Sequence, residues 1–340
     1  MQDVPSFEME FLDYLTFGLY FVVLCAIGFW AGRKEKHNQE DYFLAGRSLP
    51  WYVVGGSFIA SNISAEHFIG MIGAVFIFGI ALASYEWGCL ITFSFLLWIF
   101  IPFLLKARIF TVPEYMEKRF SPSTRHFFAF VPIVSNIFAF LTAVLYGGGL
   151  ALHKLFGWDL WTSIIVLGVV AGSWAIYGGL KSVAWTDFMT VIVMFLGGTL
   201  VSILGLHMLS GDANSIIEGF KVMLERNAAK AGIWKEVVEL NTPNMVQEDS
   251  YNRLSVMQPL SHEVAPWTLW VFSHFSLGFW FFVLNQFMVQ RLLGAKNLYH
   301  ARMGMVFAGY LKIFLPIIIV IPGLVLFARY PETMQLPWDE

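Results

Sequence analysis

An apolar segment near the start of the chain contains side chains that a membrane interior does not normally hold. Residues 57–71 include three serines together with Asn62, Glu66 and His67, and glycines stand on both sides. A bilayer core offers no water to these groups, so each must find a partner within the protein. The pattern favours a helix that breaks and turns its carbonyl oxygens inward, the usual setting for solute and ion sites in secondary transporters. The alternative is a kinked, tightly packed helix whose serines bond to its own carbonyls.

Further ionisable groups lie deep in other apolar segments. A charge at the centre of a membrane helix costs roughly 2.5–3.5 kcal/mol on the insertion scale, so a retained charge is a functional candidate. Lys312 stands about ten residues into its span and needs an opposite charge, for which Glu86 is the first choice. The pair could instead be a structural tie between helices. Asp187 stands at the expected start of a span, where it either serves function or complements the helix dipole.

The same residues do not form a recognisable catalytic constellation. Glu66 and His67 are adjacent, so their side chains do not share a helix face. No HExxH or CxxC spacing occurs in the sequence. We therefore predict that the protein is not an enzyme.

The composition is that of a polytopic membrane protein. Of the 340 residues, 57% are hydrophobic and only 13% are charged, whereas soluble domains carry about 25% charged residues. The net charge of −3 and the lack of a strongly basic cluster predict no nucleic-acid partner. Cys25 and Cys89 both lie in apolar segments and are expected to be small buried residues rather than a disulfide or a metal pair.

Eight segments are long enough to cross a hydrocarbon core of about 30 Å, which takes about 20 helical residues. They are 10–32, 51–79, 81–107, 126–153, 158–178, 185–210, 265–287 and 303–328. If the spans alternate, the loops on one side carry 13 of the 21 basic residues, and the positive-inside rule places both termini outside. The long polar loop 211–264 then also lies outside, and apolar residues at helical spacing from Ile216 to Leu224 predict a short amphipathic helix within it.

Several longer motifs resemble those of the sodium/solute symporter family, in particular the sodium/glucose and sodium/galactose cotransporters. Besides the stretch 57–71, these motifs are EDYFLAGRSLP at 40–50, ASYEW at 83–87, TVPEY at 111–115, YGGLKSVAWTD at 177–187, and the pairs Asn285-Gln286, Gln290-Arg291 and Ala295-Lys296. Their length and order make the resemblance specific, and it extends over essentially the whole chain.

The resemblance implies an all-α polytopic membrane protein with a LeuT-like fold, in which five helices are repeated in inverted orientation after an extra leading helix. On this basis the chain, 1–340, is a single transmembrane transporter domain that ends early in the second repeat. Its expected parts are the leading helix 10–32, the first repeat 51–210, the extracytoplasmic loop 211–264 and the first two helices of the second repeat, 265–328. The family's remaining sodium ligands would lie beyond Glu340, so we expect this chain to be a C-terminally truncated fragment of a longer protein, with a natural truncation as the alternative.

The resemblance also implies sodium-driven uptake of a sugar by alternating access, with sodium as the co-transported ion. The carbonyls of Ala60 and Ile63 match part of the family's sodium site, and Asp187 matches an aspartate associated with sodium coupling. The positions that hydrogen-bond sugar hydroxyls in family members are occupied here by His67, Glu86, Cys89 and Lys312, and the gate positions by Met71 (outer) and Phe281 (inner). Donors and acceptors of this kind suit a neutral polyol, and a carbonyl-lined break suits a small hard cation.

Three positions depart from the family pattern. Cys89 stands where a close relative has serine, Gly278 where a sugar-binding polar residue is expected, and Phe281 where the inner gate tyrosine is expected. We therefore predict uptake of a neutral sugar or polyol without choosing glucose or galactose. The alternatives are a symporter for a non-sugar solute, such as an organic acid or vitamin, and a non-transporting solute sensor.

The expected location is the plasma membrane, which the chain crosses several times with its N-terminus outside. The short connecting loops are also compatible with a bacterial inner membrane. The expected partners are a small neutral solute, sodium and the lipid bilayer, and the sequence predicts no particular oligomeric state.

Overall fold

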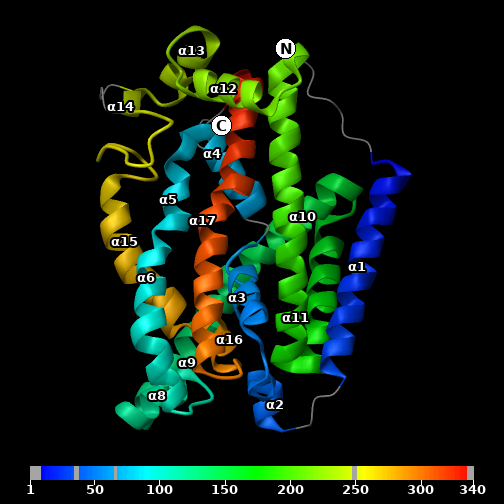
Figure 1. Ribbon diagram of the computed structural model, residues 1–340, viewed down its shortest axis with the longest axis vertical. Helices are drawn as coiled ribbons and strands as arrows, with labels where there is room; N and C mark the ends of the chain where they lie inside the picture. Colours follow the sequence, from blue (N-terminus) through cyan, green and yellow to red (C-terminus); the bar gives the residue numbers. More distant parts are fainter. Residues whose placement is uncertain (1–8, 34–37, 65–66, 247–250, 335–340) are drawn as a thin grey trace. The chain divides into compact units, whose positions relative to one another are not determined.

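The computed structural model describes residues 9–33, 38–64, 67–246 and 251–334, and this part of the chain is almost entirely helical (Figure 1). Two isolated β-bridges occur among these residues, and none of them lies in a strand. The predicted all-α membrane architecture is therefore confirmed.

The helices of the first half are α1 (Phe11–Gly32), α2 (Gln39–Leu44), α3 (Trp51–Ala60), α4 (Ile72–Phe78), α5 (Ala83–Trp87), α6 (Cys89–Phe95), α7 (Ile101–Lys106), α8 (Val112–Arg119), α9 (Pro122–Ser135) and α10 (Thr142–Phe156). Those of the second half are α11 (Leu160–Ser210), α12 (Ile216–Asn227), α13 (Gly232–Asn241), α14 (Pro243–Val246), α15 (Trp267–Phe279), α16 (Gln286–Leu293) and α17 (Leu298–Arg329).

These helices form two compact units that alternate along the sequence. Unit 1 consists of Met1–Glu66, Ile101–Val191 and Asn285–Phe307, and unit 2 consists of His67–Phe100, Ile192–Leu284 and Ala308–Glu340. The long helices α11 and α17 contribute residues to both units.

Among the described residues, six helical stretches are long and apolar enough to cross a membrane. They account for the eight predicted spans because two of them turn back on themselves. In α11, Gly179 has φ 53° and ψ −149°, a conformation open almost only to glycine. A Cβ on Gly28 would lie 3.2 Å from Trp174 and 3.3 Å from Thr186, whereas a straight helix would separate those two residues by about 18 Å. One span therefore ends at Gly179 and the next begins there, earlier than the predicted start at residue 185.

The stretch from 67 to 106 turns back in the same way near Gly79, whose φ is 78°. The side chains of His67 and Glu86 approach within 3.4 Å, although a straight helix would separate them by about 28 Å. In Figure 1 the chain rises through α4 and descends through α5 and α6. Two predicted spans are thus present in this one helical stretch.

Two spans are also interrupted. Helix α3 ends at Ala60 and residues 61–64 are not helical, before a π-helical turn covers His67–Met71. The interruption predicted from the polar residues is confirmed, while Glu66 lies outside the described residues. A second break occurs at Asn285, whose backbone is extended between the π turn Trp280–Leu284 and α16.

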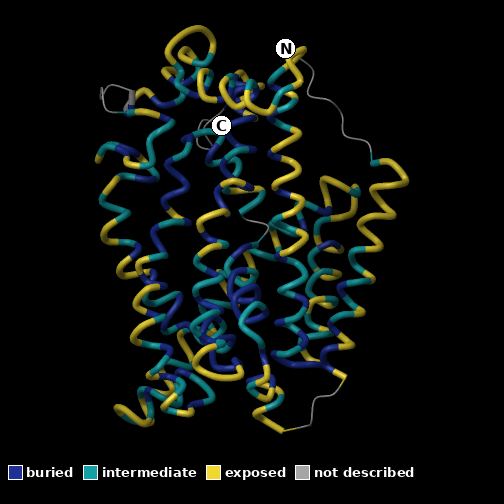
Figure 2. The backbone as a smooth tube through the Cα atoms, viewed as in Figure 1, coloured by how far each residue is buried: buried dark blue, intermediate teal, exposed yellow. Residues whose placement is uncertain are grey.

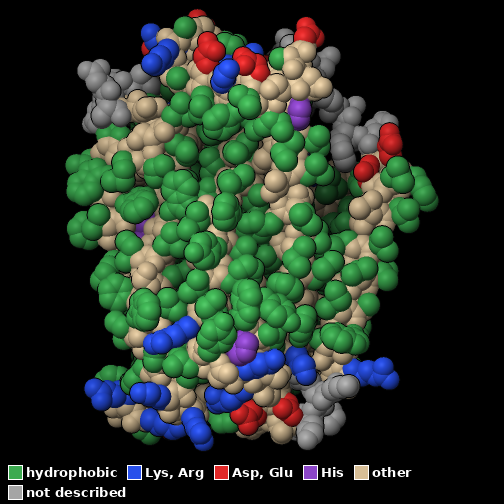
Figure 3. All heavy atoms as spheres, viewed as in Figure 1, with side chains coloured by type: hydrophobic (Ala, Val, Ile, Leu, Met, Phe, Trp, Pro, Cys, Tyr) green, Lys and Arg blue, Asp and Glu red, His purple; other side chains and the backbone are tan. Residues whose placement is uncertain are grey.

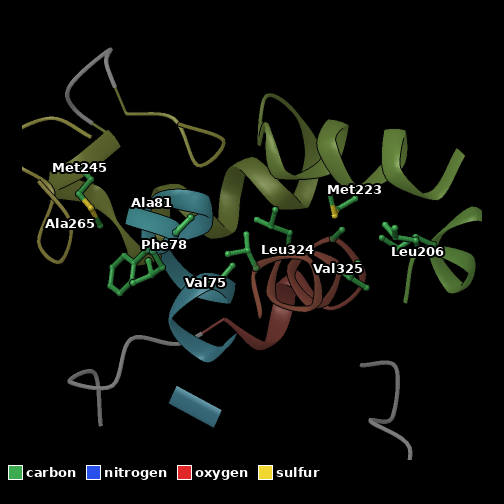
Figure 4. Close-up of a cluster of buried hydrophobic side chains, with 14 residues drawn as sticks. Val75, Phe78, Ala81, Leu206, Met223, Met245, Ala265, Leu324 and Val325 are labelled. Atoms are coloured by element: carbon green, nitrogen blue, oxygen red, sulfur yellow. The ribbon is translucent and has the colours of Figure 1, made fainter. Parts of the chain in front are cut away.

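The core of unit 2 joins the membrane helices to the loop that follows α11. Figure 4 shows Val75 and Phe78 of the α4 segment close to Leu324 and Val325 of α17, with Met223 of α12 above them. Helix α12 is the amphipathic helix predicted from the loop sequence. It contributes a buried side chain to this core, so the loop is a packed part of the unit.

Arg253 fastens the end of this loop to the turn between α4 and α5. Its guanidinium carbon lies 3.7 Å from the ring centre of Phe327, and Nη2 donates to the carbonyl of Phe76 at 2.8 Å. Nη1 donates to the carbonyl of Ile77, and the Arg253 carbonyl accepts from the Ile80 N–H at 2.8 Å. Burial lowers the pKa of Arg253 to about 10, so the side chain stays charged at neutral pH and binds carbonyls that the helix end leaves free.

A histidine in the same loop must stay neutral to keep its hydrogen bonds. Nδ1 of His262 accepts from the backbone N–H groups of Val264 at 3.2 Å and Ala265 at 3.0 Å. Burial lowers the pKa of His262 from 6.5 to about 4. A proton on Nδ1 would remove both bonds.

In unit 1, α3 is almost completely buried, and α9 with α10 forms an exposed face (Figure 2). Gly55 of α3 packs against the Gly304 backbone so closely that a Cβ would overlap it. No residue is buried in the most apolar part of the stretch Pro122–Phe156. Apolar side chains on this face have only the lipid as solvent.

Candidate functional site

The structure brings two intramembrane charges, Glu86 and Lys312, into direct contact within unit 2. Lys312 Nζ donates to Glu86 Oε2, and the two residues are only 2% and 3% exposed, respectively. They come from α17 and α5, so the contact joins two helices that are far apart in the sequence. The pairing predicted from the depth of Lys312 is confirmed. Because both charges are buried, removal of one leaves the other uncompensated.

Two more of the predicted solute-binding residues surround this pair. His67 Nε2 lies 3.4 Å from Glu86 Oε1, the carboxylate oxygen that Lys312 does not occupy. Cys89 is buried, and its thiol donates to the backbone carbonyl of Glu86 at 3.0 Å. All four predicted solute-binding residues therefore belong to one cluster around Glu86. Its donors and acceptors are close together, while the central ion pair carries no net charge.

A second histidine, His274 of α15, lies against the same helices. Its ring packs on Gly88, where a Cβ would overlap it, and stands 6.3 Å from the ring of Tyr85. His274 is buried, and its Nε2 has no hydrogen-bond partner among the described residues. Sequence reasoning missed this residue, although the rule for ionisable groups inside spans applies to it as well.

The glycine at position 278 has a packing reason. A Cβ there would lie 2.6 Å from Oγ1 of Thr92. That hydroxyl donates to the backbone carbonyl of His274 at 3.1 Å, so it is fixed in place. The departure from the family pattern at Gly278 is thus matched by a neighbour that fills the space.

The two predicted gate residues lie in the π turns. Met71 ends the turn that begins at His67 and packs against the unit 2 core. Phe281 lies in the turn Trp280–Leu284, with its ring 4.8 Å from that of Phe282. Phe282 in turn contacts Phe93 edge-on at 4.9 Å. Both predicted gates therefore lie where backbone hydrogen bonding departs from the α-helical pattern, and their gating roles stay predictions.

Unit 1 contains a separate polar cluster around Asp187. The Ser57 hydroxyl donates to Asp187 Oδ2 at 2.6 Å, and the Ser61 hydroxyl approaches the same oxygen at 3.4 Å. Arg291 Nη2 stands 3.4 Å from Asp187 Oδ2, and its Nε donates to Ser57 Oγ at 3.1 Å. Asp187 is thus bound to α3 and α16 instead of to the start of its own helix, where the dipole alternative placed it.

The predicted sodium ligands lie at the adjacent end of α3. The Ile63 N–H is shared between the carbonyls of Ile59 at 3.1 Å and Ala60 at 3.3 Å, so the hydrogen bond that it gives to the Ala60 oxygen is a long one. The amide oxygen of Asn62 is buried without a hydrogen-bond partner among the described residues. Carbonyl and amide oxygens are the hard ligands that a small cation prefers, and the role of Ala60 and Ile63 as sodium ligands stays a prediction.

Arg291 is a site residue that the sequence reasoning left without a role. The resemblance placed it in a motif without a function, yet it is only 8% exposed and contacts Asp187. The signal that could have found it is its place in the Gln290-Arg291 motif, directly after an interrupted span.

Comparisons with known proteins agree with this architecture. The family model "Sodium:solute symporter family" matches residues 42–335. A sodium/glucose cotransporter of Vibrio parahaemolyticus is 37% identical over 93% of this chain and 55% of its own length. A sodium/myo-inositol cotransporter of Mus musculus is 31% identical over 93% of this chain and 44% of its own length. The chain spans about half the length of the curated relatives it matches.

A solved structure shares the fold. The substrate-bound, outward-open structure of a Na⁺-coupled sialic acid symporter matches this chain with a TM-score of 0.77 and 19% sequence identity. The matched region covers 98% of this chain and 65% of the symporter chain. The interrupted and reversing helices thus define a polytopic membrane protein of the LeuT-like transporter fold. The chain belongs to the sodium:solute symporter family.

Proposed function

We propose that the chain is part of a sodium-coupled symporter that takes up a neutral sugar or polyol by alternating access. The observation that carries the proposal is the buried pair of Glu86 and Lys312, with His67 on the second carboxylate oxygen. Relatives named for glucose and myo-inositol support it, because both solutes are neutral and rich in hydroxyl groups.

The charge balance of the cluster favours a neutral solute. The carboxylate accepts hydrogen bonds, the ammonium donates them, and the imidazole does either, so hydroxyl groups of both orientations find partners. A carboxylate-bearing solute would bring a second negative charge toward Glu86, whereas Lys312 is already neutralised. Discrimination then follows from polar groups that are left unpaired when a solute lacks a hydroxyl.

Sodium is proposed to bind at the end of α3. Its ligands are the carbonyls of Ala60 and Ile63, and Asp187 supplies negative charge nearby. Asp187 also contacts Arg291 at 3.4 Å, a long separation for an ion pair. A cation at α3 would therefore compete with Arg291 for the carboxylate. Met71 and Phe281 are proposed as the outer and inner gates.

The distribution of Lys and Arg among the loops supports the proposed orientation of the chain in the membrane. The N-terminus lies outside a plasma membrane, or outside a bacterial inner membrane, and the Lys- and Arg-rich loops lie in the cytoplasm.

Uptake by the full-length protein in proteoliposomes tests the proposal. Radiolabelled glucose and myo-inositol should accumulate with an inward sodium gradient and fail to accumulate when choline replaces sodium. Lys312→Met should abolish solute binding, whereas Lys118→Met, which removes an exposed lysine of α8, should leave it unchanged. Uptake that is equal in choline would refute sodium coupling.

A second pair of variants separates the ion site from the solute site. Asp187→Asn should raise the sodium concentration needed for half-maximal uptake, with little change in solute affinity at saturating sodium. Asp159→Asn is the matched control, because asparagine keeps the cap that Asp159 forms on Thr162 at the start of α11. Competition by carboxylates or vitamins but not by sugars would replace the polyol assignment, and binding without uptake would favour a sensor.

A further inference from the structure

A pocket of about 370 Å³ opens in unit 1, and its lining includes no residue of the Asp187 cluster. Its walls come from the end of α1, the segment that leads into α3, the part of α11 after Gly179, and the loop between α16 and α17. The side chains that decide its chemistry are Trp30, Arg33, Tyr52, Lys181, Trp185 and Lys296. These segments are distant in sequence, so only the folded chain brings them together.

The pocket concentrates positive charge. Arg33, Lys181 and Lys296 line it, and no described residue of its lining is acidic. None of the three forms an ion pair with another described residue, whereas other basic residues of this end, such as Lys118 and Arg125, pair with glutamates. Figure 3 shows Lys and Arg side chains gathered at the end of unit 1 that carries α2 and α8. Three like charges around one cavity repel each other unless an anion lies between them.

Aromatic side chains also line the pocket. The rings of Trp30 and Tyr52 each lie 6.2 Å from the ring of Trp185, in edge-on geometry. Trp30 belongs to the last turn of an apolar membrane helix and is 66% exposed. Tryptophan and tyrosine at the end of a span mark the depth of the lipid headgroups. The pocket is therefore lined both by cations and by amphipathic rings of the kind found at the membrane interface.

We propose that this pocket binds the phosphate group of an anionic phospholipid. The three cations would hold the phosphate oxygens by charge-assisted hydrogen bonds, while the glycerol and first acyl carbons would pack on Trp30 and Trp185. Basic pockets between membrane helices on the cytoplasmic side are suited to such headgroups. A free phosphate ion would use the cations equally well but would leave the aromatic side chains without a partner, so the lipid accounts for both kinds of lining residue.

The lipid would also have a structural consequence. Arg33 directly follows α1, Lys181 belongs to α11 and Lys296 lies in the loop before α17, so one headgroup would link three segments of unit 1. This proposal does not depend on the identity of the transported solute or on sodium coupling.

Native mass spectrometry of the full-length protein tests the proposal. The protein is released from nanodiscs of phosphatidylcholine that contain a titrated fraction of phosphatidylglycerol, and retained lipids are counted. The triple variant Arg33→Gln, Lys181→Gln, Lys296→Gln should lose retention of phosphatidylglycerol at least tenfold. A control triple variant with the same loss of charge at Lys106, Lys118 and Arg119, basic residues of α7 and α8, should retain it as the wild type does.

Two further arms make the result decisive. Lys296→Gln alone, which changes an exposed loop side chain, should reduce retention measurably even if the triple variant is poorly folded by size-exclusion chromatography. Inorganic phosphate at millimolar concentration should not displace the lipid. Equal losses in the pocket and control variants, unchanged retention in Lys296→Gln, or displacement by inorganic phosphate would each overturn the assignment of this pocket to a lipid.

Discussion

The buried contact between Glu86 and Lys312 allows a sharp test by a double-mutant cycle. The variants are Lys312→Met, which keeps the length of the side chain, Glu86→Gln, which keeps the shape of the carboxylate, and the two combined. If the pair is as buried as its 2–3% exposure indicates, each single change leaves one charge without its partner. The double variant leaves none, because both charges have been removed.

The expected magnitudes follow from this burial. Breaking a buried ion pair by removal of one partner costs about 3–5 kcal/mol, and two charges about 4 Å apart interact by about 4 kcal/mol at the effective dielectric of protein sites. Lys312→Met should fall at the lower end, because His67 remains 3.4 Å from Glu86 and can still donate a hydrogen bond to its carboxylate. Glu86→Gln should fall at the upper end, since it leaves Lys312 without a carboxylate. The double variant should lose less than the sum, by at least about 2 kcal/mol.

Reversible unfolding in mixed detergent and SDS micelles measures these free energies for the four proteins. Solute binding measured in parallel should be lost in all three variants, because restored stability does not restore the missing donor and acceptor. If the loss of unfolding free energy in the double variant equals the sum of the losses in the two single variants within about 0.5 kcal/mol, the two charges are not coupled. That result would refute the reasoning.

Three further predictions concern unit 2. Arg253→Met should lower the free energy of unfolding by about 2–4 kcal/mol, because two buried carbonyls lose their donor. Arg119→Met, at an exposed position of α8, is the control and should change it little. Equal losses in the two variants would contradict the role of Arg253. Gly278→Ala should cost about 1–3 kcal/mol through overlap with Thr92, and an unchanged unfolding curve would show that the helices adjust freely. His262 has a folded pKa of about 4, below the ordinary 6.5, so its contribution to stability is complete above pH 6.5 and is lost as the pH falls toward 4. Amide protection factors of residues 251–266 should therefore drop between pH 6.5 and pH 5, and His262→Gln should remove that dependence; a drop that persists in the variant would assign it to another group.

The sequence predicted features that depend on the membrane itself. Long apolar segments must cross the bilayer, and polar groups inside them must be paired. These two rules were enough to place the spans, the interruption after Ala60, and the contact between Glu86 and Lys312. Helix α12 was predictable because its apolar residues recur at helical spacing in a polar loop.

Features that depend on how segments meet were not predictable. Arg291 was read as a loop charge that sets orientation, because its contact with Asp187 exists only in the folded chain. The start of the sixth span was placed six residues late, since Gly179 permits a tighter turn than the composition indicated. The last helix begins at Leu298, five residues before the predicted start at 303, because the polar residues that precede the apolar run still form helix.

The distance in sequence between Glu86 and Lys312 sets an order of events during biosynthesis. The two residues are 226 positions apart, so at a synthesis rate of about 5–20 residues per second Lys312 is made roughly 10–45 s after Glu86. Throughout that interval the nascent chain holds the Glu86 carboxyl group in or near the bilayer without its ammonium partner. The unpaired group makes the free energy of membrane insertion less favourable. Until α17 leaves the ribosome, this carboxyl must be shielded by His67, neutralised by a proton, or kept at the water boundary, so assembly of unit 2 cannot finish before its last helix has been translated.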